Sequence, residues 1–210
     1  MTSRENILGR LTEARERRPQ GTTREPDLSA PIYHEPKGSL ADWFQENLEL
    51  VAGTVYRPKN LTEATELIAE LQPKENWERV FCADPKLQAA LNGKVTYQKE
   101  VADFPELQVG ITPCEFLVAH LGSVMISSAG ASGRRLHVFP ETHIVVAHQR
   151  QLVKFLDDAM EAIQAKYHGS LPSSITNITG PSRTADIEKT LVMGMHGPKK
   201  LIVMLCDEPF

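Results

Sequence analysis

Residues 177–205 read NITGPSRTADIEKTLVMGMHGPKKLIVML, and this stretch holds the main signals of the fold. An apolar segment ends at a Gly-Pro pair, which is typical of a turn. Polar residues with an acidic pair follow, and an uninterrupted apolar run closes the stretch. The pattern predicts a strand over 173–180, a helix over 183–194 and a strand over 199–206. This order is typical of α/β proteins with a parallel sheet.

The loop before the predicted helix has the residues of an anion site. Gly180 can adopt backbone angles that other residues avoid, and Ser182 or Thr184 can accept a hydrogen bond from a free helix N–H group. Arg183 carries a planar guanidinium that suits a carboxylate or a phosphate. Because the N-terminus of a helix also attracts anions, the loop is a candidate binding site for a small acid.

A second interpretation of the same loop needs no ligand. Asp186 and Glu188 would lie in the first turn of the predicted helix, where a carboxylate contributes about 0.3–1 kcal/mol through the helix dipole. The same carboxylates would repel a bound phosphate. The spacing therefore favours a helix capped by its own side chains, and Arg183 supports an anion site only if it points into a pocket shared with other loops.

The preceding part of the chain alternates between predicted strands and helices. Strands are expected at 51–57, 77–83, 107–112, 123–128, 136–139 and 143–148. Helices are expected at 39–50, 60–71, 85–93, 113–122 and 151–167. The alternation predicts an α/β domain with a mostly parallel central sheet and helices on both of its faces. Three consecutive strands between positions 123 and 148 interrupt the alternation and predict a local antiparallel section or hairpin.

Residues 1–38 are predicted to be separate from this domain, which is expected to cover residues 39–210. Residues 3–18 predict an exposed amphipathic helix, and four prolines between positions 19 and 36 predict a loop or arm. Such an arm can wrap a partner or a second subunit of a homo-oligomer, or it can pack on its own domain. The sequence favours neither arrangement.

Composition and charge exclude several functions. A net charge of −4, with scattered basic residues, gives no surface for nucleic acid or anionic lipid. Three cysteines without a CxxC pair cannot hold an iron–sulfur cluster, and the histidines are not spaced like metal ligands. No apolar run is suited to spanning a membrane, and the polar start is unlike a secretory signal. We therefore expect a cytoplasmic chain without a metal or cofactor of its own.

Two further loops are predicted at the carboxyl ends of strands, where α/β proteins bind ligands. The first ends at Glu115. The second, over residues 121–135, ends with Arg134 and Arg135, which can form a solvated turn or, together with Arg183, a patch for acids. The histidines near these loops that can titrate at neutral pH are His120, His137 and His196. For each of them a structural role is the simpler interpretation.

The motifs GIT, GS, GRRL, HIVV, LPSS, GPSRTADIE and HGP follow one another in this order between residues 110 and 198. In this order they resemble the LUD domain, and within it the lactate utilization protein C family. The resemblance extends over about residues 39–207. It implies a fold similar to that of the group of ribose-5-phosphate isomerase, CoA transferase and formyltetrahydrofolate cyclo-ligase.

The resemblance also implies a role in the oxidation of L-lactate to pyruvate beside two iron–sulfur partner proteins, one of them cysteine-rich and the other with its own LUD domain. Since this chain lacks cluster ligands, the iron–sulfur clusters are expected in the partners. What remains for this chain is to bind a small organic acid or to dock a partner, as an accessory subunit.

The sequence departs from the family pattern before Gly122. The family commonly has an acidic residue and a threonine there, and this chain has His120 and Leu121. The change removes a carboxylate and puts any acid–base role of that position in doubt, whereas the acidic position at Glu115 is kept. The candidate catalytic residues are Glu115, His120 and His196. The candidate ligand-binding residues are Gly122, Ser123, Arg134, Arg135, Gly180, Ser182, Arg183 and Thr184.

Two other functions fit the sequence. One is a stand-alone enzyme of the isomerase, CoA transferase or cyclo-ligase type, acting on a phosphorylated or CoA-like ligand. The absence of a recognisable lysine-bearing phosphate loop counts against this enzyme. The other is a scaffold without catalytic activity, whose N-terminal arm clasps a partner. The sequence leaves open whether the chain is an enzyme.

Overall fold

The computed structural model describes residues 2–17, 38–98, 100, 103–185, 191–194 and 196–210. The chain divides into two compact units, Met1–Glu35 and Pro36–Phe210. Most of the predicted arm lies outside the described residues, and so do Asp186 and Glu188.

The first unit contains one helix, α1 (Ser3–Glu16), within its described residues. Thr2 caps it, because the Thr2 hydroxyl accepts a hydrogen bond from the N–H of Glu5 and the Glu5 carboxylate accepts one from the N–H of Thr2. No side chain of α1 is buried. The predicted exposed helix is thus confirmed. What its apolar residues pack against is not decided by the described residues.

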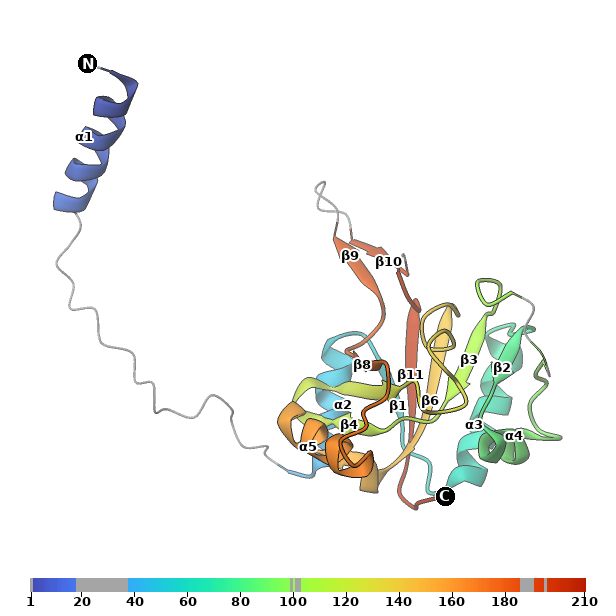
Figure 1. The fold of residues 1–210 in the computed structure, drawn as a ribbon. Coiled ribbons are helices and arrows are strands. Elements are labelled where there is room, and N and C mark those ends of the chain that lie inside the picture. Colours follow the sequence, from blue (N-terminus) through green and yellow to red (C-terminus); the bar gives the residue numbers. More distant parts are fainter. Residues whose placement is uncertain (1, 18–37, 99, 101–102, 186–190, 195) are drawn as a thin grey trace. The chain divides into compact units, whose positions relative to one another are not determined.

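The second unit is built on a sheet of five parallel strands (Figure 1). Its strands, in spatial order, are β1 (Thr54–Tyr56), β11 (Lys200–Cys206), β6 (Thr142–His148), β3 (Val109–Thr112) and β2 (Val80–Cys82). The two longest strands, β6 and β11, are buried almost throughout. The predicted parallel central sheet is therefore confirmed, and its core strands are the apolar runs of the sequence.

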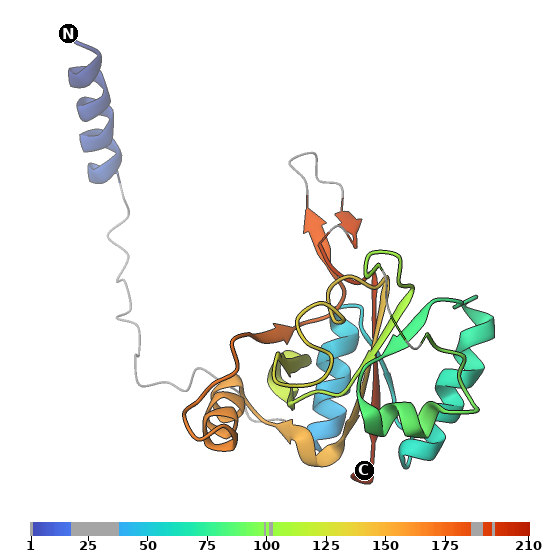
Figure 2. The same cartoon turned by 45° about the vertical axis from the view of Figure 1, so that its right-hand side comes forward.

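Side chains of this sheet alternate between its two faces. Ile144 and Val146 of β6 pack toward α3 (Leu61–Lys74) and α4 (Pro85–Leu91), whereas Val145 and Ala147 pack toward α2 (Leu40–Leu50). Figure 2 shows α2 on one side of the sheet and α3 and α4 on the other. Helices on both faces are thus confirmed, and Ser39 and Asn60 cap α2 and α3 by accepting hydrogen bonds from the N–H groups of Asp42 and Glu63.

A second, four-stranded sheet lies on the α2 side. Its strands, in spatial order, are β7 (Leu152–Val153), β4 (Phe116–Val118), β5 (Ser123–Ser127) and β8 (Ile175–Ile178). The predicted antiparallel section lies here, because β5 runs antiparallel to both β4 and β8. It is not a hairpin with β6, which belongs to the central sheet. The helix α5 (Leu156–Lys166) covers the small sheet with Ala159 and Ile163.

Two local predictions between residues 113 and 139 are wrong. The predicted helix over 113–122 is the strand β4 followed by a 3-10 turn, η1 (Ala119–Leu121). Its aromatic and β-branched residues suit a strand, and its backbone pairs with β5 and β7. The predicted strand over 136–139 is a turn, because the N–H groups of Val138 and Phe139 both donate to the carbonyl of Arg135.

The predicted helix over 183–194 is also wrong. The described residues there form β9 (Arg183–Ala185) and β10 (Leu191–Met193), which pair antiparallel. Two backbone hydrogen bonds fix this ribbon, from the N–H of Ser182 to the carbonyl of Pro198 at 2.8 Å and from the N–H of Gly194 to the carbonyl of Ser182 at 3.0 Å. The helix N-terminus on which the predicted anion site depended is therefore not formed at Arg183.

In the parts of the chain that the structure describes, every helix is too short or too polar to cross a bilayer.

Candidate functional site

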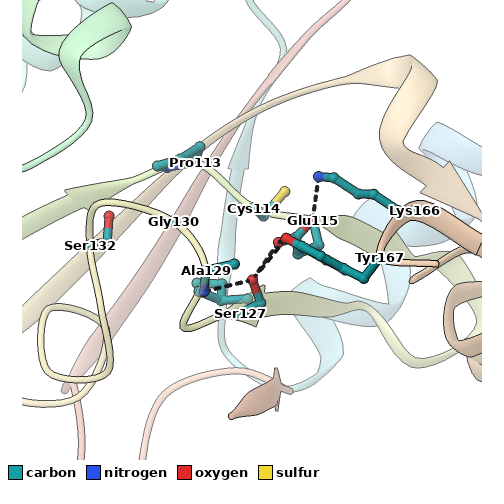
Figure 3. A pocket seen from close by; sticks show the side chains of 10 residues that line it. Pro113, Cys114, Glu115, Ser127, Ala129, Gly130, Ser132, Lys166 and Tyr167 are labelled. Atoms are coloured by element: carbon teal, nitrogen blue, oxygen red, sulfur yellow. Dashed lines mark hydrogen bonds and ion pairs between the residues drawn. The ribbon is translucent and has the colours of Figure 1, made fainter. Parts of the chain in front are cut away.

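A cavity of about 240 Å³ lies at the carboxyl end of β3 (Figure 3). Its walls come from residues 113–115 after β3, from the end of β5 at Ser127, from the loop 129–132, and from the end of α5 at Lys166 and Tyr167. This placement follows the general rule that ligands of open parallel sheets bind beyond the carboxyl ends of the strands. We call it the Glu115 pocket.

Glu115 is the centre of a hydrogen-bonded cluster in this pocket. Its Oε1 atom accepts hydrogen bonds from the Ser127 hydroxyl at 2.5 Å and from the Tyr167 hydroxyl at 2.6 Å. Its Oε2 atom accepts one from the Lys166 ammonium at 2.6 Å. Figure 3 shows the Lys166 and Tyr167 side chains reaching toward Glu115. The fold thus brings together side chains from three elements that lie far apart in the sequence.

The cluster fixes the charge state of Glu115. Burial alone would raise the pKa of this carboxyl, but the hydrogen bonds from Lys166, Ser127 and Tyr167 outweigh burial and hold the pKa below its usual value. Burial and the Glu115 carboxylate both raise the pKa of the Tyr167 hydroxyl. At neutral pH the pocket therefore holds a carboxylate, a neutral phenol and an ammonium, and Glu115 is a poor general base there.

Exposure distinguishes the two charged partners. The Glu115 side chain is only 9% exposed, whereas that of Lys166 is 55% exposed. An ammonium has three donor protons, and Glu115 takes one of them. Lys166 can therefore hold an anion at the mouth of the pocket while it stays paired with Glu115. The Tyr167 and Ser127 oxygens can accept hydrogen bonds from a ligand hydroxyl.

Cys114 also lines the pocket but does not have the properties of a nucleophile. Burial, and then the nearby Glu115 carboxylate, raise the pKa of its thiol well above the usual value. The Gln151 amide donates to its backbone carbonyl at 2.6 Å and holds this segment in place. No group of three or more His, Cys, Asp or Glu side chains within the described ranges is arranged to hold a metal ion.

A second cavity, of about 200 Å³, brings together three predicted site residues, Gly180, Ser182 and His196. His137 also lines it, and we call it the His137 pocket. Burial lowers the pKa of His137, whose Nδ1 atom has no hydrogen-bond partner in the described part of the chain. His196 is exposed. Unlike the Glu115 pocket, this pocket is lined by no Asp, Glu, Lys or Arg among the described residues.

Arg134 and Arg135 line a third, larger cavity of about 530 Å³. The Arg135 guanidinium lies over the Phe104 ring, 4.4 Å from its centroid. Arg183 is exposed in β9 and is absent from the walls of all three cavities. Thr184 pairs with Val192 in the same ribbon. The sequence left open whether Arg183 converges with Arg134 and Arg135 on one patch, and these three cavities do not bring them together.

The remaining predicted site residues have structural roles in this fold. Gly122 has a positive φ of 57°, and a side chain there would collide with the backbone of Asn47 and Leu48. Ser123 is fully buried and donates a hydrogen bond to Asn177 at 2.9 Å. The His120 ring packs against Trp43, with the ring centroids 5.3 Å apart. None of these three residues lines a cavity described above.

Sequence reasoning missed Ser127, Lys166 and Tyr167. Lys166 and Tyr167 end an amphipathic helix, and Ser127 ends a strand, so each has an ordinary local role. Only the three-dimensional structure shows that they donate hydrogen bonds to the Glu115 carboxylate. Their position at the ends of elements was the one available signal, because sites form where strands and helices end.

Comparisons with known proteins agree with this fold. A sequence model described as the LUD domain matches residues 41–206. The lactate utilization protein C of Shouchella clausii is 38% identical over 112 residues, and that of Bacillus subtilis is 33% identical over 113 residues. Each match covers 53% of this chain and 47% of the relative, so the chain spans about half the length of these relatives.

A solved structure shows that the fold is shared. The crystal structure of a DUF162 family protein from Deinococcus radiodurans aligns with a TM-score of 0.59 and 20% identity, covering 80% of this chain and 96% of that one. The family itself is shown by the sequence model, which covers most of the chain. The chain therefore belongs to the LUD domain family, in which its curated relatives are lactate utilization C proteins.

Proposed function

We propose that this chain is an accessory subunit of a system that oxidises L-lactate to pyruvate, and that it binds a small organic acid in the Glu115 pocket. Family membership and the names of the curated relatives support the role in lactate utilization. The chain spans about half the length of those relatives. Their role is therefore a proposal for this chain, and the experiment below tests it on the chain itself.

The observation that carries the binding role is the position of Lys166. Its ammonium is paired with a buried carboxylate and is still more than half exposed at the mouth of a cavity. The cavity, at about 240 Å³, is smaller than the roughly 300–1,000 Å³ of pockets for drug-sized ligands. It therefore suits a metabolite of a few carbon atoms, with its carboxylate on Lys166 and a hydroxyl or carbonyl group near Tyr167.

In this proposal the electrons pass through iron–sulfur clusters of partner proteins. The chain has three cysteines, and burial raises the pKa of the Cys82 thiol to about 12 and that of the Cys206 thiol to about 11. Thiolates, which ligate iron, are thus disfavoured at these two positions.

Reconstitution tests the proposal. Tagged chain, expressed in a host that carries the lactate utilization proteins, is expected to co-purify with iron-containing partners. L-lactate-dependent reduction of a dye by the assembled proteins should fall when this chain is omitted and return when it is added back. Full dye reduction without the chain would rule the proposal out.

A further inference from the structure

Ser132 lies in the walls of two cavities at once, the Glu115 pocket and the cavity of Arg134 and Arg135. The two cavities therefore adjoin at this residue. Ser132 is only 9% exposed. Its hydroxyl has no hydrogen-bond partner among the residues that the structure describes. Buried hydroxyls are nearly always hydrogen-bonded, so this one needs a partner that the protein itself does not supply.

The outer cavity carries two positive charges. Arg134 donates a hydrogen bond to the Ser173 hydroxyl at 2.5 Å, and Arg135 stacks on Phe104. Within the described residues neither guanidinium forms an ion pair with a carboxylate, in contrast to Lys166 and Arg57. Guanidinium groups bind carboxylates and phosphates through two parallel hydrogen bonds. The outer cavity is thus suited to an anionic group.

The inner cavity supplies a different set of contacts. The Lys166 ammonium is already paired with Glu115, so the inner end has little net charge but several hydrogen-bonding groups. A ligand that fills both cavities would place a polar or carboxylate end beside Lys166 and a second anionic end between the arginines. Ser132 lines both cavities, and its hydroxyl, which lacks a partner among the described residues, can donate to such a ligand.

We propose that the two cavities form one binding site for an elongated acid with two anionic groups, a dicarboxylate or a phosphorylated acid. The inference rests on the proposed binding role of the Glu115 pocket and specifies its ligand class. L-Lactate, with a single carboxylate and three carbons, would leave the arginine end unoccupied. The chain would then sense or deliver a diacid in the system to which it belongs.

Calorimetric titration of the full chain tests the inference. The probes are L-lactate, succinate, glutarate and 3-phosphoglycerate, and the last separates phosphate from carboxylate recognition. At least one of the three acids with two anionic groups is expected to bind about tenfold more tightly than L-lactate, since one charge-assisted contact is worth that much. Dianions that bind no more tightly than L-lactate would overturn the proposal.

Variants locate the second anionic group. Arg134→Gln with Arg135→Gln should weaken binding of the dianion about tenfold and leave L-lactate binding within about twofold. Arg4→Gln with Arg10→Gln removes the same charge from the exposed helix α1 and is the matched control, which should bind the dianion like the parent chain. Both arginines of the cavity are exposed, so the variants should keep the parent melting temperature.

Ser132→Ala gives an independent readout. It should weaken binding of the acid with two anionic groups about threefold to tenfold. The melting temperature should stay unchanged or rise, because the variant removes a buried hydroxyl without a partner. An equal loss in the α1 control, or no loss in the arginine variant, would overturn the inference. These binding tests are independent of the reconstitution experiment. Titration can reject the two-ended site while reconstitution supports the lactate role, and the reverse can also occur.

Discussion

The Glu115 pocket and the His137 pocket differ in which parts of the chain supply their polar groups and in whether those groups are charged. In the Glu115 pocket, charged and hydroxyl groups from distant segments satisfy one another through short hydrogen bonds. The described lining of the His137 pocket contains no Asp, Glu, Lys or Arg, and it comes largely from residues 176–182 and 196–198, the glycine-rich stretch that looks most like a site in the sequence.

The glycines of that stretch have a structural explanation. A side chain at Gly180, where φ is 78°, would lie 2.5 Å from the carbonyl oxygen of Val51, and one at Gly197 would contact Ser182 at 3.2 Å. These glycines let backbone segments approach each other closely. A glycine-rich motif can thus mark the fold of a family, whereas the partners of Glu115 in the other pocket lie on segments without an evident motif.

The largest expected effect concerns the Glu115 ion pair, and a matched pair of variants measures it. Lys166 and Lys199 are both 55% exposed and lie 2.6 and 2.7 Å from their carboxylates, but Glu115 is 9% exposed and Glu141 is 56% exposed. Lys166→Met should lower the free energy of unfolding by about 1–3 kcal/mol, because it leaves a buried carboxylate without its cation. Lys199→Met should cost less than about 1 kcal/mol.

Urea unfolding at pH 7 checks this difference. Equal losses in the two variants would show that the Glu115 pair is no different from a surface ion pair, and the contrast between the two pockets would lose its electrostatic basis.

The next effect is a pH dependence of the free energy of unfolding, and it arises at His143, whose ring lies beside that of His137. Burial, and then the neighbouring His137, lower the pKa of His143 to about 3. Below about pH 6.5 the unfolded chain binds a proton that the folded chain does not, so stability falls as the pH decreases, by about 1 kcal/mol between pH 6.5 and pH 5.5. His143→Gln should reduce the slope between pH 6.5 and pH 5.5, as measured by urea unfolding at both values, whereas His137 and His148, whose pKa values are also lowered by burial, keep their own contributions.

Glu115 does not contribute to that slope. Its folded pKa is lowered, so its contribution to stability is complete above the unfolded value of about 4.3 and is lost as the pH falls further, through the folded pKa. An unchanged slope in the His143 variant would mean that His143 is protonated in the folded chain.

A smaller effect is expected for Tyr167→Phe. The variant removes one hydrogen bond to Glu115 and leaves those of Ser127 and Lys166 in place. The free energy of unfolding should fall by about 0.5–1.5 kcal/mol, and the pKa of Glu115, followed by NMR, should rise toward its usual value. A pKa that stays unchanged would show that the phenol does not stabilise the carboxylate.

The smallest effect is expected for His196→Ala. His196 is exposed at the rim of the His137 pocket, so the variant should stay within about 0.5 kcal/mol of the parent chain. Binding of an acid in the Glu115 pocket should also be unchanged. A loss of acid binding here, larger than that of Lys166→Met, would reverse the assignment of the two pockets.

Much of the fold followed from the sequence because its strands are apolar runs and its helices have clear caps. β6 and β11 are such runs, and Ser39 and Asn60 cap the helices that were expected there. The strand β4 was taken for a helix because three residues are too few for a period, and its pairing with β5 and β7 is set by tertiary contacts.

The site was less predictable than the fold. Glu115 was a candidate, since the loop after β3 lies at a carboxyl end, but its partners lie 12 to 52 positions away along the chain. The stretch 183–194 was taken for a helix from its polar start, whereas backbone pairing makes its described residues a β-ribbon. Long-range contacts of this kind have no period or spacing that one sequence can show.

The most direct test of the central claim is an NMR titration of the ¹⁵N-labelled chain with glutarate, followed at each backbone amide. We expect the shifted amide signals to be those of residues 114–115, 127–132 and 166–167, with those of 134–135 at the outer end. The signals of residues 176–182 and 196–198 should stay in place. Shifts confined to the second set, with none around Glu115, would contradict the account.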